Sequence, residues 1–273
     1  MRLARQGTRM DQYLWLIPLG FIVGAYGTLI GAGGGFVLMP ALLLLYPGDT
    51  SDLLAAVSLA VVFFNAGSGS VAYGRMRRID YKSGLLLSAA TIPGAVLGAM
   101  TTGFIPRPIF DGILGIVMIL VSAFLIWRPM LRGASMLAAM AERDGTDRLG
   151  SYNLPLGLGL SLVVGYVSSL LGIGGGIIHV PVLVHLLGFP VHVATATSHF
   201  ILSFMSLAGT GVHVASGVFV HGVRRTIALA IGVVAGAQLG AWLSSRLRGQ
   251  WIMRGLAVAL GFVGLRVLAL AFE

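Results

Sequence analysis

Residues 29–40 read Leu-Ile-Gly-Ala-Gly-Gly-Gly-Phe-Val-Leu-Met-Pro, and residues 170–181 read Leu-Leu-Gly-Ile-Gly-Gly-Gly-Ile-Ile-His-Val-Pro. Each copy lies inside a long apolar stretch, so three consecutive glycines fall where a membrane helix would otherwise be continuous. A straight helix over residues 13–46 would be about 51 Å long, far more than the roughly 30 Å of bilayer hydrocarbon. We therefore predict a helix break at each motif, followed by a short helix of about a dozen residues.

The composition indicates a membrane protein. Of the 273 residues, 57% are hydrophobic and only 10% are charged, and the mean hydropathy is +0.94. Soluble domains carry about a quarter charged residues. The net charge of +9 comes from basic residues in short loops between apolar spans, which is typical of membrane topology and not of nucleic-acid binding. The chain has no cysteine, which excludes disulfides and thiol chemistry.

Apolar windows of about 20 residues divide the chain into two halves that repeat the same order. The predicted segments are 13–46, 53–73, 84–104 and 109–127, and then 153–187, 191–214, 226–244 and 251–271. The halves align at an offset near 141, since Gly31, Gly33 and Pro40 match Gly172, Gly174 and Pro181. We predict a first transmembrane repeat over 13–127, a cytoplasmic linker over 128–152 and a second repeat over 153–271.

The topology prediction assumes that each broken segment crosses the membrane once. The lysines and arginines then favour eight crossings, with both termini in the cytoplasm. Four crossings per repeat is an even number, so the two repeats would run parallel to each other. The expected fold is thus an all-α polytopic membrane protein with about eight transmembrane crossings in two parallel four-helix repeats.

The glycine breaks are the first candidate for binding. A helix that starts inside the membrane presents free N–H groups and the positive end of its dipole, which together favour an anion. We assign anion coordination to the two glycine triplets, namely Gly33, Gly34, Gly35, Gly174, Gly175 and Gly176. The alternative is that these glycines only allow helices to cross closely. The nine acidic residues all fall in loops or at predicted helix ends, which argues against a cationic substrate.

A polar stripe on segment 191–214 is the second candidate. Its residues recur every three or four positions and share one helix face, on which we single out Thr195, Ser198, His199 and Ser203. The stripe predicts a pathway lining, with His199 binding an anion or relaying protons. The alternative is hydrogen bonding between helices. Further candidate ligands are Asn65, His179 and Gln238. Six histidines without a HExxH motif do not predict a metal site, and the chain has no catalytic motif that would indicate an enzyme.

The paired motif Gly-x-Gly-Gly-Gly-x(5)-Pro at 31–40 and 172–181, each followed by a polar helix, resembles the sulfite exporter TauE/SafE family. The second polar helix contains Ala-Thr-Ala-Thr-Ser at 194–198, and the resemblance covers roughly residues 13–270. It implies a bacterial inner-membrane carrier of sulfur-containing anions such as sulfite, sulfonates or thiosulfate. The first repeat departs from the pattern with Ala-Ala-Val-Ser at 55–58, which argues against equal roles for the two halves.

These observations predict a secondary transporter that exports a small sulfur-containing anion, sulfite or an organosulfonate, across the bacterial inner membrane. The anion would be held between the two intramembrane helix N-termini. Two alternatives remain open: an uptake permease for thiosulfate or another small anion, and a non-transporting membrane scaffold subunit. The expected partners are the anion and the lipid bilayer, with a homodimer as a further candidate assembly. No cofactor and no nucleic acid are expected.

Overall fold

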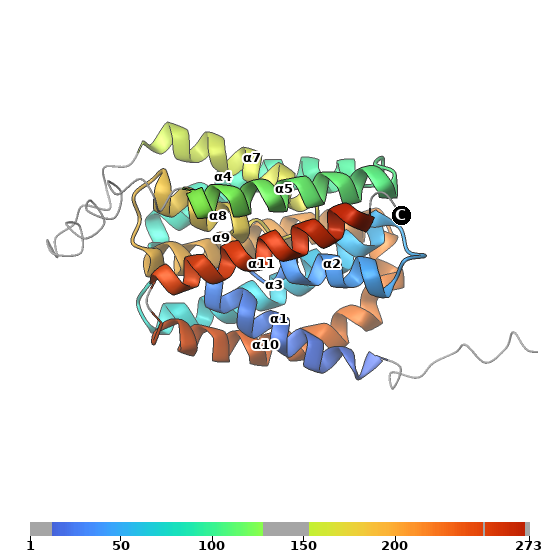
Figure 1. The fold of residues 1–273 in the computed structure, drawn as a ribbon, viewed down its shortest axis with the longest axis horizontal. Helices are drawn as coiled ribbons and strands as arrows, with labels where there is room; N and C mark the ends of the chain where they lie inside the picture. Colours follow the sequence, from blue (N-terminus) through green and yellow to red (C-terminus); the bar gives the residue numbers. More distant parts are fainter. Residues whose placement is uncertain (1–12, 128–152, 248, 271–273) are drawn as a thin grey trace, which may run out of the picture.

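The computed structural model describes residues 13–127, 153–247 and 249–270, and helices are the only regular secondary structure in these ranges, as predicted (Figure 1). The first half contains α1 (Leu16–Ile30), α2 (Gly35–Leu45), α3 (Ser51–Arg75), α4 (Tyr81–Thr102) and α5 (Arg107–Trp127). The second contains α7 (Leu154–Leu170), α8 (Gly176–His185), α9 (Val191–Ala215), the 3-10 helix η4 (Val218–Gly222), α10 (Val223–Ser244) and α11 (Gly249–Leu270). The predicted linker 128–152 lies outside the described residues.

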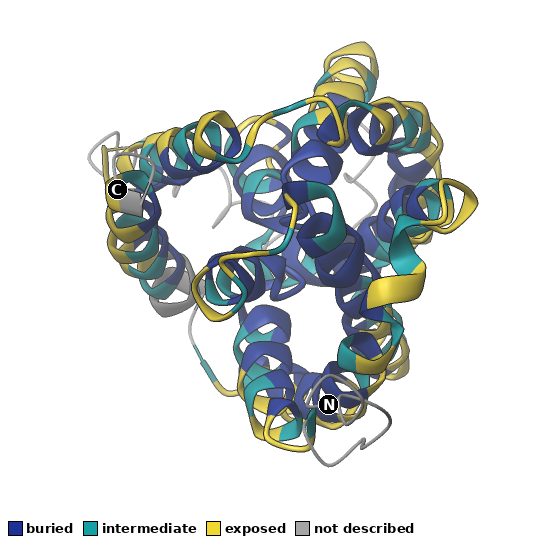
Figure 2. Cartoon of the chain, turned by 90° about the vertical axis from the view of Figure 1, so that its right-hand side faces the viewer, coloured by how far each residue is buried: buried dark blue, intermediate teal, exposed yellow. Residues whose placement is uncertain are grey.

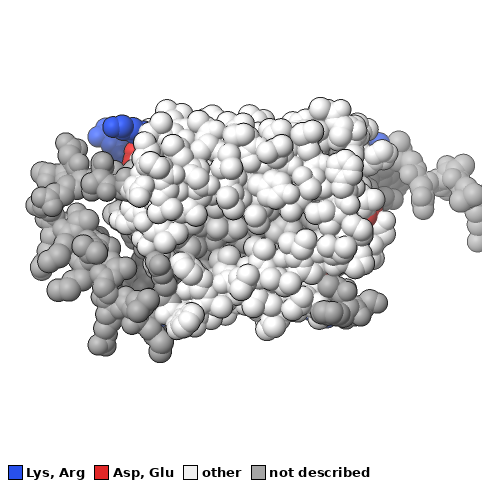
Figure 3. Space-filling view, turned by 90° about the horizontal axis from the view of Figure 1, so that it is seen from above, with Lys and Arg blue, Asp and Glu red and all other residues white. Residues whose placement is uncertain are grey.

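The surface of the helix bundle is that of a multi-pass membrane protein. Within the described ranges, five helical segments are long and apolar enough to cross a bilayer: α3, α4, α5, α9 and the continuous stretch Val218–Ser244. Large apolar side chains such as Ile22, Leu97 and Phe262 point outward, around an interior that is buried (Figure 2). On the face shown in Figure 3, the charged side chains of the described residues lie at the two ends of the long axis. A surface without charged side chains from which large apolar side chains project suits lipid and not water.

Both predicted helix breaks are present. α1 ends at Ile30 and α2 starts at Gly35, while α7 and α8 are separated by residues 171–175. The backbone φ angle is +84°, +74° and +78° at Gly31, Gly33 and Gly34, and +65°, +80° and +72° at the corresponding glycines of the second motif. Side chains with a Cβ rarely adopt this left-handed conformation, which is why the motif needs glycine at these positions.

Each break reverses the chain, so the prediction that a broken segment runs straight through the membrane is wrong. In the first half, a Cβ atom on Gly34 would lie 2.8 Å from Val23 Cγ1, although a straight helix would place these two residues about 16 Å apart. In the second half, His179 Nε2 lies 3.3 Å from Ser161 Oγ, which a straight helix would place about 27 Å away.

The two reversals form helical hairpins, α1–α2 and α7–α8. α1 has 15 residues and is about 22 Å long, too short to cross the hydrocarbon by itself. Hydropathy windows measure only the length and polarity of a segment, so they cannot distinguish a bent helix from a reversal. Figure 1 shows α2 returning toward the end of the molecule from which α1 starts.

The first hairpin packs along α10 through small residues. Added Cβ atoms at Gly20 and Gly24 would overlap the α10 backbone at Leu229 and Val233, so the two helices are in backbone contact. The residue numbers rise together along this contact, which means that α1 and α10 run in the same direction. Such small-residue contacts are the usual means of close helix packing in membranes.

The second hairpin packs in the matching way along α4. Gly94 and Gly98 of α4 meet the α7 backbone at Leu162 and Tyr166, again with numbers rising together. α4 and α10 follow α3 and α9 through short connections, and α3 and α9 are themselves antiparallel, as shown by the 2.8 Å contact between Asp52 and His213. α1 and α7 therefore run in opposite directions, and the predicted parallel relation of the two halves is wrong.

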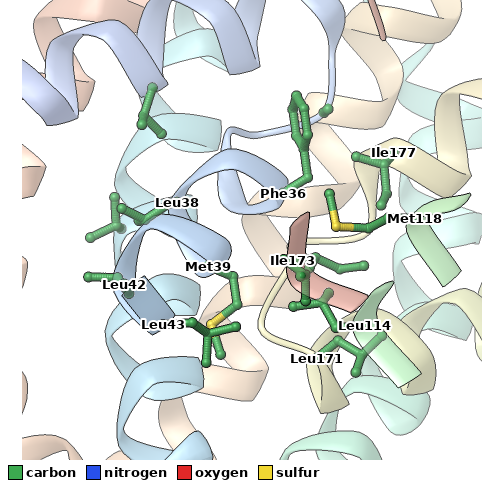
Figure 4. Packing of buried hydrophobic residues seen from close by; sticks show 14 of the residues in the cluster. Phe36, Leu38, Met39, Leu42, Leu43, Leu114, Met118, Leu171, Ile173 and Ile177 are labelled. Atoms are coloured by element: carbon green, nitrogen blue, oxygen red, sulfur yellow. The ribbon is translucent and has the colours of Figure 1, made fainter. Parts of the chain in front are cut away.

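The core lies where the two hairpins meet. Figure 4 shows Phe36 and Met39 of α2 facing Ile173 and Ile177 of the second break region, beside Met118 of α5. All of these side chains are buried. The largest buried cluster thus joins residues of both halves around the two glycine motifs.

The hairpins predict where two loops lie relative to the membrane. Gly48 follows α2 and Leu186 follows α8, and the hairpins open toward opposite ends of the molecule. The test uses the single-cysteine variants Gly48→Cys and Leu186→Cys of this cysteine-free chain, treated with a membrane-impermeant thiol reagent. In intact cells the reagent should label one of the two variants. It should label the other variant only after the cells are permeabilised. The unmodified chain is the control for background labelling. Labelling of both from outside would contradict the hairpins, because eight straight crossings place both loops on the outer side.

Candidate functional site

The two glycine breaks touch each other at the centre of the molecule. A Cβ atom on Gly35 would lie 2.5 Å from the carbonyl oxygen of Ile173, and one on Gly176 would lie 2.5 Å from Ala32 Cα. These distances are too short for any side chain, so the two breaks meet backbone to backbone. α2 and α8 both begin at this contact and run toward opposite ends. Their N-termini therefore converge on one central point.

Two serines hold the breaks in place reciprocally. Ser58 on α3 donates a hydrogen bond of 2.5 Å to the carbonyl oxygen of Gly172. Ser198 on α9 donates one of 3.1 Å to the carbonyl oxygen of Gly31. In each case a long helix of one half, α3 or α9, supports the break of the other half. Ser198, predicted as a substrate ligand, thus has its hydroxyl engaged with the protein backbone.

The first turns of α2 and α8 supply backbone donors. In the first break, the N–H groups of Ala32 and Gly33 bond to the Gly27 carbonyl, and those of Val37 and Leu38 bond to Gly34. The N–H groups that have no acceptor among the described residues are those of Gly34, Gly35 and Phe36, and in the second break those of Gly174, Gly175 and Ile177. Free N–H groups and a positive dipole end at both helices make this centre favourable for an anion.

Apolar side chains close the centre in this conformation. Val62 of α3 and Leu202 of α9 lie against Gly33, and Val62 also lies against Gly174. Together with Ala66 they form a small buried cluster. Met205 Sδ would lie 3.0 Å from a Cβ on Gly175. The glycines of both breaks are buried, so they are not exposed to solvent in this structure.

A buried polar network flanks the first break. Thr28 Oγ1 donates to Asn65 Oδ1 at 3.1 Å, and His199 Nε2 lies 3.1 Å from the same Thr28 oxygen. Since the Thr28 hydroxyl proton goes to Asn65, Nε2 of His199 is the donor in that contact. Tyr73 donates a hydrogen bond of 2.6 Å to the Thr28 carbonyl and packs edge-on against the His199 ring. The network ties α1, α3 and α9 together at the level of the break.

Carboxylates are absent from this centre among the residues that the structure describes. Asp49 and Asp52 lie at the end where α3 begins, and Asp80 caps the start of α4. Asp111, in the second turn of α5, lies 3.4 Å from Arg107. The prediction from sequence that the acids avoid the middle of the helices agrees with these positions. A central site without nearby carboxylates among the described residues favours an anionic ligand over a cation.

Comparison with known proteins shows where this architecture occurs. Residues 16–267 match the sulfite exporter TauE/SafE family. The chain belongs to this family. It is 33% identical to the probable membrane transporter protein YunE of Bacillus subtilis, over 94% of this chain and 97% of that protein. It is also 24% identical to the probable membrane transporter protein MJ0441 of Methanocaldococcus jannaschii, over 94% and 97% of the two chains. No solved structure matches.

Family membership assigns the chain to membrane transporters and not to enzymes. Another relative, the probable membrane transporter protein YfcA of Escherichia coli, is 25% identical over 86% of this chain and 81% of its own length. In this TauE/SafE member, the two breaks that meet at the centre belong to the glycine motifs at 31–40 and 172–181, which resemble the family in sequence. The site described above is therefore the natural candidate for substrate binding.

The structure brings some of the predicted site residues together and separates others. The two glycine triplets meet at the centre, with Thr195 against Gly31, and Asn65 and His199 beside them. Ser203 is partly exposed and donates to the Phe200 carbonyl of its own helix. Gln238 is exposed and bonds to Ser68 on α3. His179 lies within the second hairpin, against Ser161.

Some residues of the centre were not expected from the sequence. Thr28 organises the polar network, Tyr73 supports it, and Val62 and Leu202 cover the glycines. Thr28 could have been found, because it stands three residues before Gly31 and matches Ser169, three residues before Gly172. Apolar residues such as Val62 carry no such signal, since nothing distinguishes them from ordinary core residues.

The backbone contact between the breaks makes a stability prediction. Gly176→Ala should destabilise the protein by about 1–3 kcal/mol, because the added methyl group overlaps the backbone of the other break. The matched control is Gly211→Ala on α9, where a Cβ meets nothing within 4 Å and alanine should be neutral or stabilising. Thermal unfolding in detergent, followed by tryptophan fluorescence, measures both. Equal midpoints for the two variants would contradict the close contact.

Proposed function

We propose that the protein is a secondary transporter that exports a small sulfur-containing anion, sulfite or an organosulfonate, from the cytoplasm. The observation that carries the proposal is the convergence of the α2 and α8 N-termini on one central point without a nearby carboxylate among the described residues. Two positive helix ends and their free N–H groups would stabilise one anion. The family name supports sulfite or a related sulfur oxyanion as the substrate.

The proposed membrane arrangement has six crossings and two re-entrant hairpins. α3, α4, α5, α9, α10 and α11 would cross the membrane, and α1–α2 and α7–α8 would enter it from opposite sides. The two repeats, over 13–127 and 153–271, would then be inverted and related by an axis in the membrane plane. The matching contacts of α1 with α10 and of α7 with α4 support this arrangement. It replaces the eight crossings expected from the sequence.

The proposed orientation places both termini outside the cytoplasm. Counting along the six-crossing topology, the segments on the side that holds residues 75–82 and 128–152 contain eleven of the eighteen lysines and arginines. The positive-inside rule assigns that side to the cytoplasm. The sequence predicted both termini in the cytoplasm. The location of the termini is reversed here because the hairpins change the number of crossings between the N-terminus and residues 75–82, which stay cytoplasmic. The bacterial inner membrane remains the proposed location.

Transport would require the closed centre to open to one side at a time. Val62, Leu202 and Met205 cover the glycines, so a hairpin must move relative to α3 and α9 to expose the anion. Two hairpins that enter from opposite sides would provide one gate for each side. The cytoplasm is electrically negative, so exit of an anion is favourable by about 2.3 kcal/mol per charge at 100 mV. Export would then need no second coupled ion.

The other proposed ligands line the same centre. Asn65 has a buried amide nitrogen without a partner among the described residues, and His199 is held beside it through Thr28.

The remaining alternatives are uptake of thiosulfate or another small anion, and a non-transporting scaffold. Each of them makes a different prediction for flux.

The test is efflux from proteoliposomes loaded in turn with sulfite, thiosulfate, sulfate, taurine, sulfoacetate and acetate, with membrane potential and pH gradient set independently. We expect saturable efflux of one sulfur anion, accelerated by a negative interior. Gly175→Ala should reduce it, because the methyl group crowds Met205 at a position with φ +72°. The control Gly188→Ala has a similar φ of +75° but open space around it, so backbone strain alone should leave the flux high.

Four results would overturn parts of the proposal. Acetate as the preferred anion would contradict a sulfur substrate. Flux in one direction only, inward, would replace export with uptake. Folded protein that carries none of the six solutes would favour the scaffold. Equal flux for Gly175→Ala and Gly188→Ala would move the binding site away from the second break.

A further inference from the structure

The two hairpins differ in the chemistry of the seam between their helices. In the second hairpin the seam contains Ser161, Ser168 and His179. At an offset of 141, the corresponding positions in the first hairpin are Gly20, Gly27 and Leu38. Gly27 there lies directly against the backbone of Gly34, which closes that seam. One hairpin is thus apolar and tightly closed, while the other carries three polar side chains.

Polar atoms in the second seam have no partner. Ser168 is fully buried, and its hydroxyl makes no hydrogen bond to any described residue. It lies 3.3 Å from where a Cβ would stand on Gly175, the residue that precedes α8, so the hydroxyl lies at the N-terminus of that helix. The N–H groups of Gly174 and Gly175 are free there as well. A buried hydroxyl without a partner costs free energy, which a ligand that accepts its hydrogen bond at the N-terminus of α8 would recover.

His179 adds a second donor to the same hairpin. It is fully buried in the first turn of α8, and its Nε2 lies 3.3 Å from Ser161 Oγ. When Nε2 accepts the Ser161 proton, the neutral ring carries its own proton on Nδ1, which has no partner among the described residues. The first break contrasts with this arrangement, because the hydroxyl of Thr28 is already engaged with Asn65 and His199.

We propose that the seam between α7 and α8 is the selective half of the anion site, in which Ser168 and His179 donate hydrogen bonds to the oxygens of a sulfur oxyanion at the N-terminus of α8. This inference rests on the proposed function and locates it on one hairpin. The first hairpin, with its engaged Thr28 and its apolar seam, is the structural partner that closes over the anion. A sulfur oxyanion has several oxygen acceptors, so each of these donors can give a hydrogen bond to a different oxygen of one ligand.

The test compares two variants that remove the donors one at a time. Ser168→Ala deletes only the hydroxyl, and His179→Leu installs the residue found at the matching position of the first hairpin. The probe is sulfite, measured as efflux from proteoliposomes and as the rise in thermal midpoint of the detergent-solubilised protein. Ser88→Ala is the control, because this buried serine on α4 already donates to its own helix at Gly84.

We expect the KM for sulfite to rise about tenfold or more in Ser168→Ala and in His179→Leu, since each loses a hydrogen bond to a charged group. The midpoint without sulfite should stay near that of the wild type, while the sulfite-dependent rise should shrink. Ser88→Ala should keep the wild-type KM. A KM within twofold of wild type in Ser168→Ala would overturn the inference while sulfite transport by the wild type stands. No sulfite flux and no midpoint rise in folded wild-type protein would overturn the proposed function itself.

Discussion

The contact between the two glycine breaks is the constraint on which the rest of the structure depends. Gly35 touches the carbonyl of Ile173, and Gly176 touches Ala32, so no side chain fits between the breaks. Two hairpins can meet in this way only if each is short and turns sharply. Left-handed glycines provide the turn, and 15 and 17 residues in α1 and α7 set how deeply the hairpins reach.

Irregular backbone inside a membrane must have its polar groups satisfied by protein or by a ligand. Here the protein satisfies one carbonyl of each break, that of Gly172 through the hydroxyl of Ser58 and that of Gly31 through the hydroxyl of Ser198. The N–H side is left open at both helix starts among the described residues. These open N–H groups, together with the positive dipole ends of α2 and α8, are the electrostatic basis for proposing an anion as the cargo.

The surrounding helices make the central contact possible. Glycines on α10 and α4 let these helices touch the backbones of α1 and α7, so each hairpin is held by a helix of the other half. α3 and α9 lie between these pairs and carry the serines that bind the breaks. The two halves are therefore interleaved and not stacked side by side. A movement of one hairpin would be transmitted to the opposite half through these contacts.

The sequence was sufficient to predict where the helices lie and where they break. Segment 191–214, for example, corresponds to α9 over Val191–Ala215, and both glycine motifs interrupt helices as expected. The direction of the chain after each break could not be predicted, because it depends on tertiary contacts such as that of His179 with Ser161. Helical periodicity placed Ser203 and His199 on one face but could not show that Ser203 bonds within its own helix.

The residues of the candidate site could also be predicted only in part from the sequence. Glycine and buried polar residues stand out in an apolar sequence, so Asn65, Ser198 and His199 could be selected. Gln238 stands out equally, yet it lies on the exposed side of α10 against Ser68. Val62 and Leu202 cover the glycines but resemble any other core residue. Which polar residue faces the centre is decided by helix rotation, and this is fixed by the glycine contacts with neighbouring helices.

The most direct test of the account is a distance measurement across each hairpin by pulsed electron spin resonance. Spin labels would be placed on exposed positions as the pairs Leu14→Cys with Leu45→Cys, and Leu156→Cys with Leu186→Cys. Straight broken helices would separate these pairs by about 47 Å and about 45 Å along the helix axis. The hairpins predict distances far below these values for both pairs. Distances near 45 Å in either pair would contradict the reversal on which the central site depends.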